Sequence, residues 1–121
     1  MILSLTLAAC GNITTITPDG QETTRSREEF ESYVESVFRR QNQASVEAGQ
    51  LVNEEIRPRN RGELEAAERN MLRACSALNQ VVKLKMEQQD PGIFLELEVR
   101  DTIGDCDFAT RILEQLIALQ E

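Results

Sequence analysis

The sequence predicts an all-α domain in which an antiparallel helical hairpin is followed by one or two C-terminal helices, a three- to four-helix bundle. Apolar residues recur at spacings of 3 and 4 over two long stretches, the period of an amphipathic helix. Short segments rich in proline and glycine separate these stretches and predict turns. With 121 residues in all, one domain is expected.

The first helix is expected to begin at Ser26 and to end by Arg57, before Pro58. Ser26 and Glu29 have the spacing of a capping box, in which each residue satisfies a free N–H of the other. The stripe that faces inward consists of Phe30, Val34, Val37, Gln41, Ala44, Ala48 and Leu51. It is widened by Tyr33, Phe38, Val52 and Ile56.

A second helix is expected over about residues 63–89, after a turn at 58–62 that makes the two helices antiparallel neighbours. Its stripe consists of Leu64, Ala67, Met71, Ala74, Leu78 and Val81. Folding the chain about the turn brings Gln41 level with Asn79. The two amides therefore form either a hydrogen-bonded layer that sets helix register or the polar wall of a small-ligand pocket.

The C-terminal part is harder to assign, because residues 93–100 combine a possible helix start at Asp90 with the alternation of a strand. We expect a helix here, since a lone strand would have no partner. An interruption is expected at 101–105, and a last helix at about 106–119. Its inward residues would be Phe108, Ile112, Leu116 and Leu119.

The N-terminal part has no helical period and contains the motif Leu7-Ala8-Ala9-Cys10. This motif resembles the lipobox of bacterial lipoproteins, although no lysine or arginine precedes the apolar run. The resemblance implies that residues 1–9 are the remnant of a signal peptide and that Cys10 carries the lipid. Export and membrane anchoring would follow, on the periplasmic face of the outer membrane in a Gram-negative host, because glycine follows Cys10. Alternatively, residues 1–9 form a buried strand or helix end.

Under this interpretation residues 10–25 are the lipid attachment site and a flexible tether, with a turn at 18–20, and residues 26–121 are the bundle. In an exported protein Cys75 and Cys106 would form a disulfide that stabilises the fold by roughly 3–4 kcal/mol. In the cytosol they would be free buried thiols.

Composition narrows the possible functions. The net charge of −8 argues against nucleic-acid binding and against a polybasic membrane patch. The chain has no histidine, which removes histidine-based catalysis and a zinc site completed by histidine. No metal or cofactor is expected. Arg57, Arg59 and Arg61 cluster between the first two helices, where they would either bind an acidic partner or compensate the helix dipole.

The sequence thus indicates a small lipid-anchored cell-envelope protein that acts by binding an envelope protein or by assembly, and not an enzyme. A homodimer is possible, because the spacing in the first helix is heptad-like. Two alternatives are a small-ligand carrier or enzyme that uses Gln41 and Asn79, and a cytosolic helical interaction protein whose lipobox is fortuitous.

Overall fold

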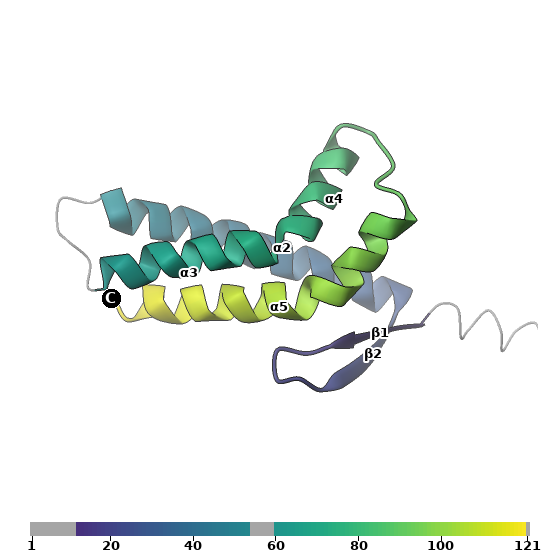
Figure 1. The fold of residues 1–121 in the computed structure, drawn as a ribbon, viewed down its shortest axis with the longest axis horizontal. Coiled ribbons are helices and arrows are strands. Elements are labelled where there is room, and N and C mark those ends of the chain that lie inside the picture. The colour runs from purple at the N-terminus through teal and green to yellow at the C-terminus, as the bar shows by residue number, and fades with distance from the viewer. Residues whose placement is uncertain (1–11, 54–59, 121) are drawn as a thin grey trace, which may run out of the picture.

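A computed structural model describes residues 12–53 and 60–120, which are predominantly helical, as predicted, but include a small β-hairpin (Figure 1). The elements in chain order are β1 (Asn12–Ile16), β2 (Glu22–Ser26), α2 (Arg27–Asn53), α3 (Arg61–Ala74), α4 (Ser76–Met86) and α5 (Ile93–Ala118). Among these helices none is long and apolar enough to cross a membrane. The expected end of the first helix at Arg57 lies outside the described residues.

The β-hairpin corrects the prediction of a flexible tether. β1 and β2 pair antiparallel, with Asn12 opposite Ser26 and Ile16 opposite Glu22. The side chains of Ile13 and Thr15 are buried while their neighbours in β1 are exposed. The threonine-rich segment therefore has the alternation and β-branching of a strand, rather than the composition of a linker. The expected turn at 18–20 is confirmed: the Gly20 N–H donates to the Thr17 carbonyl oxygen, and Gly20 has a positive φ of 87°, which glycine adopts readily.

The capping box at the start of α2 is confirmed. The Ser26 backbone N–H donates to Glu29 Oε1 at 2.8 Å, and the Glu29 N–H donates to Ser26 Oγ at 3.1 Å. The hydrogen bond with the Ser26 backbone is the main reason that the pKa of the Glu29 carboxyl lies below its usual value, and the hydrogen bond with the Ser26 side chain adds to it. The buried face of α2 lies within the predicted stripe and consists of Phe30, Val37, Gln41, Ala44 and Ala48.

The second predicted helix is two helices. Cys75 has φ −93° and ψ 10°, outside the α-helical range, and α4 leaves α3 at an angle there (Figure 1). The apolar spacing of 3 and 4 continues through Cys75, from Met71 to Leu78, so the periodicity contains no sign of the bend. After the bend, α4 packs mainly on α5 and lies beside its N-terminal half (Figure 1).

α5 is one continuous helix, so the helical assignment of residues 93–100 is confirmed and the interruption at 101–105 is wrong. Gly104 does not break the helix; it allows β1 to approach, because a Cβ there would collide with the Ile16 carbonyl oxygen. The inward face is also different from the predicted one. Phe108 is 51% exposed, Ile112 and Leu119 are exposed as well, and Leu116 is half-buried. The buried face is Val99, Ile103, Cys106, Asp107, Thr110, Leu113 and Ile117.

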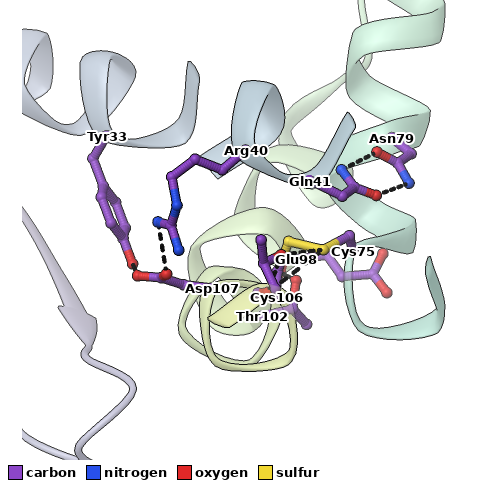
Figure 2. Close-up of a disulfide and its surroundings, with 10 residues drawn as sticks. Tyr33, Arg40, Gln41, Cys75, Asn79, Glu98, Thr102, Cys106 and Asp107 are labelled. Carbon is purple, nitrogen blue, oxygen red and sulfur yellow. Dashed lines mark hydrogen bonds and ion pairs between the residues drawn. A yellow bond between two sulfur atoms is a disulfide. The ribbon is translucent and has the colours of Figure 1, made fainter. Parts of the chain in front are cut away.

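The core is organised around α5, which contacts α2, α3, α4 and β1. The Cys75–Cys106 disulfide is confirmed: the Cα atoms are 4.6 Å apart and both residues are buried (Figure 2). The bond attaches α5 at the point where α3 gives way to α4. It therefore fixes the position of the bend.

Candidate functional site

The structure brings the two predicted core amides together. Gln41 Nε2 donates to Asn79 Oδ1 and Asn79 Nδ2 donates to Gln41 Oε1, both at 2.9 Å (Figure 2). Gln41 is only 1% exposed and Asn79 is half-buried, so the pair satisfies the buried amide of Gln41. The pair joins α2 to α4.

A second polar cluster, which the sequence analysis missed, is centred on Asp107, 1% exposed. The Tyr33 hydroxyl donates to Asp107 Oδ2 at 2.6 Å, and Arg40 and Arg111 donate to Oδ1 at 3.1 and 3.2 Å. Figure 2 shows Tyr33 and Arg40 of α2 pointing toward Asp107 on α5. The seven-residue spacing of Tyr33 and Arg40, which places them on one helix face, is the signal that would have indicated the cluster.

Electrostatics in this cluster follow from its burial and its charges. Burial, and then the hydrogen bond to the Asp107 carboxylate, raise the pKa of Tyr33. The bond to the Glu114 carboxylate raises the pKa of Arg40. The Arg25 guanidinium lies 3.9 Å from the centroid of the Tyr33 ring, so a cation–π contact ties β2 to the cluster.

Neither cluster leaves a reactive group free. Over residues 12–53 and 60–120, every buried side-chain nitrogen or oxygen has a hydrogen-bond partner. In the same part of the chain no three carboxylates or cysteines are grouped to hold a metal ion. These polar groups are thus arranged to hold helices together.

The bend at Cys75 opens an apolar cavity of about 480 Å³ between α2, α4, α5 and β1. It forms because α4, after leaving α3, contacts α2 only sparsely and packs mainly on α5. Its apolar lining includes Phe30, Val34, Phe38, Leu78, Val82 and Val99. Such a cavity, built from residues of four elements, has no signature in any one stretch of sequence.

Charged side chains surround the mouth of this cavity. Two of the acidic ones are paired: Glu31 lies 3.6 Å from Arg27, and Glu35 lies 3.9 Å from Arg39. The remaining charged lining residues are Lys85 on α4 and Glu96 and Arg100 on α5. These three form no ion pair with one another or with any other described residue, and their sum is one positive charge.

Next to the cavity, the turn between α4 and α5 exposes large apolar side chains. Met86 is 80% exposed and Phe94 is 85% exposed, and Ile93 beside them is exposed too. We call Met86, Ile93 and Phe94 the apolar tip. This turn lies at the same end of the molecule as the start of β1 (Figure 1).

The other predicted site residues are placed only in part. Arg61 begins α3 at the opposite end of the molecule from β1 (Figure 1), and its guanidinium pairs with Glu65 at 3.2 Å. Arg57, Arg59 and Cys10 lie outside the described residues.

Comparison with protein-family models, with curated proteins and with solved structures found no match to this chain.

Proposed function

We propose that this chain is a small lipid-anchored cell-envelope protein that acts by binding, and that the cavity beside α4 receives an apolar group of its partner. The observation that carries the proposal is the cavity itself. Its volume of about 480 Å³ falls within the roughly 300–1,000 Å³ of small-molecule sites. Its walls are apolar and its charged groups stand at the mouth, which is the usual arrangement of a site that recognises an apolar group.

Binding is favoured over catalysis by the state of the buried polar groups. The Asp107 carboxylate accepts three hydrogen bonds, and the Gln41 and Asn79 amides bond to each other. A general base needs a lone pair directed at substrate. Both polar clusters direct theirs at neighbouring helices.

Anchoring rests on the lipobox resemblance of Leu7-Ala8-Ala9-Cys10. The Cys75–Cys106 disulfide supports it, because disulfides persist in oxidising compartments such as the periplasm. The apolar tip lies at the end of the molecule where β1 begins (Figure 1), Ile13 of β1 lines the cavity, and β1 begins two residues after Cys10 in the sequence. An anchored molecule would thus hold its binding site near the membrane.

The anchor is tested by the intact mass of unreduced protein from native membranes, with and without thiol alkylation. We expect a chain that starts at Cys10, carries lipid and takes up no alkylating agent. A chain that starts at Met1 with three alkylatable thiols would instead indicate a cytosolic helical interaction protein.

The binding role is tested by a photo-crosslinking residue at Val34, inside the cavity, in cells that retain the lipid anchor. The control places the same residue at Gln43, which is exposed on α2 and does not line the cavity. We expect adducts with an envelope component from position 34 at a higher yield than from position 43. Equal yields from both positions would contradict a binding role for the cavity.

A small-ligand carrier centred on Gln41 and Asn79 is the second candidate. It is favoured by a further hollow of about 390 Å³, which Gln41, Asn79, Leu72 and Met86 help to line. Gln41→Leu removes the amide pair while keeping the side-chain volume. If the protein is a small-ligand carrier, this variant should no longer bind the ligand or support the phenotype of the natural chain. A stable Gln41→Leu protein with unchanged phenotype would show that the pair only sets helix register.

A further inference from the structure

We infer that the cavity beside α4 binds the acyl chain of a single-chain anionic lipid, of which a fatty acid is the simplest, with the acidic head at Lys85 and Arg100. The inference rests on the proposed binding role of the cavity and not on the lipid anchor. It specifies the chemistry of a ligand that the proposed function leaves open.

The walls favour a hydrocarbon chain. Phe30, Val34 and Phe38 of α2 face Leu78 and Val82 of α4 across the cavity, and none of these side chains carries a hydrogen-bonding group. A ligand with polar groups along its length would lose its hydrogen bonds to water without replacement. Phe38 and Val82 also line the neighbouring hollow of about 390 Å³, most of whose other lining residues are polar, so the apolar space for the chain is the cavity itself.

The mouth favours an acidic head group. The six charged residues that line the cavity, three basic and three acidic, sum to zero. Glu31 and Glu35 lie 3.6 and 3.9 Å from Arg27 and Arg39, whereas Lys85 and Arg100 form no ion pair with another described residue. Lys85 and Arg100 come from different helices, α4 and α5, and both line the cavity, so they are the cations that the inference assigns to the acidic head.

The apolar tip supplies a route for the lipid. Met86 directly follows Lys85 in sequence, and Phe94 lies two residues before Glu96, so the tip adjoins the mouth. Exposed apolar patches of this kind mark interaction or lipid-contact sites. We expect an acyl chain that leaves a lipid surface to pass along Met86, Ile93 and Phe94 toward the cavity.

The first experiment uses the full chain with Cys10→Ser, so that no lipid is attached, and measures binding of palmitate and of hexadecanol by calorimetry. We expect one palmitate per chain. In Lys85→Gln/Arg100→Gln, palmitate affinity should fall about tenfold because two charged contacts are lost, while hexadecanol affinity changes less than about twofold. The matched control, Arg69→Gln/Arg73→Gln, removes two exposed arginines of α3 that do not line the cavity and should leave both affinities unchanged.

The second experiment fills the cavity. Val34→Phe places a larger apolar group in the space of the ligand and should abolish binding of both palmitate and hexadecanol. Circular dichroism checks that the variant is folded, and Val82→Phe, on the opposite wall, provides an independent filling. Palmitate binding that survives both substitutions, or that is no stronger than hexadecanol binding in the unsubstituted cavity, would overturn the inference.

The outcomes separate this inference from the proposed function. If palmitate does not bind but the crosslinker at Val34 still captures an envelope component, the lipid inference is wrong and the binding role stands. If palmitate binds but the crosslinker at Val34 gives no specific adduct, the cavity is a lipid site, and its binding of a partner in the cell envelope is not supported. If the lipidated protein excludes palmitate while the Cys10→Ser chain binds it, the cavity holds the chain's own acyl group, and the inference of a free lipid is overturned.

Discussion

Tyr33 and Asp107 show how a small domain can bury a charge. The carboxylate of Asp107 is out of water but accepts bonds from a phenol and two guanidinium groups, which together offset its desolvation. The phenol of Tyr33 is held in its neutral, donating form by the same contact. Ionisation of Tyr33 would place two negative charges side by side, so the pair responds to alkaline pH.

We predict that stability falls at alkaline pH because of Tyr33. Burial and the bond to Asp107 raise its pKa in the folded state, so the folded chain keeps a proton that the unfolded chain loses near pH 10. This contribution is complete below about pH 10 and is lost as pH rises through the folded pKa. Tyr33 is the single tyrosine, so phenolate absorbance reports it directly.

The titration is measured in the native protein and in denaturant, together with the free energy of unfolding against pH for the natural chain and Tyr33→Phe. We expect a higher native midpoint, and a flatter alkaline decline for Tyr33→Phe. That variant should also start about 1 kcal/mol less stable because it loses a hydrogen bond. Identical midpoints in native and denatured protein would contradict this account.

Two glycines in helices should respond oppositely to alanine. Gly104→Ala would place a methyl group against the Ile16 carbonyl oxygen, and a backbone atom cannot move aside easily. We expect a loss of about 1–3 kcal/mol and faster hydrogen exchange in β1. Gly49→Ala, with nothing within 4 Å of the new methyl group, should gain about 0.5–1 kcal/mol from helix propensity. A stable Gly104→Ala protein with an unchanged hairpin would contradict the close approach.

At the level of elements, the disulfide holds the joint between α3 and α4 against α5. In a Cys10→Ser background, we predict that Cys75→Ala/Cys106→Ala lowers the free energy of unfolding by about 4 kcal/mol. Amides of α4 should exchange faster, because the bend is no longer attached to α5. Reduction of the natural pair serves as the matched control and should give a similar loss. A loss below about 1 kcal/mol would show that packing alone sets the joint.

Elements determined by local chemistry could be predicted from the sequence. The capping box at Ser26, the turn at Gly20 and the buried face of α2 follow from residues near in sequence. The contact of Gln41 with Asn79 followed from the length of one helical hairpin. In each case the spacing along the chain contains the physical information.

Features that depend on distant contacts could not be predicted. The buried face of α5 includes Asp107 and Thr110, and because these residues are polar, the sequence pattern did not indicate that this face is buried. The apolar residues Phe108 and Ile112 suggested a different face. Gly104 suggested a break because its role depends on Ile16, far away in sequence. The cavity depends on the direction of α4 after Cys75, and helical periodicity does not encode direction.

At the level of the whole molecule, α5 links the hairpin to the other helices, so we predict a single cooperative unfolding transition. Tyr33 contacts Asp107 of α5 and Arg25 of β2, and its absorbance therefore reports the hairpin and its support. We expect its urea transition to coincide with loss of helix by circular dichroism. An earlier Tyr33 transition would show that the hairpin detaches before the helices unfold.

The hairpin also decides how far an anchored molecule can reach. β1 begins at Asn12, only two residues along the chain from Cys10. With a lipid on Cys10, the segment between the lipid and the folded domain would therefore span at most about 7 Å. The folded domain would then travel with its leaflet, searching for ligands by lateral diffusion in two dimensions. A component fixed far across the periplasm would be out of its range, whereas molecules that are dissolved in or emerge from the same leaflet would meet it continually.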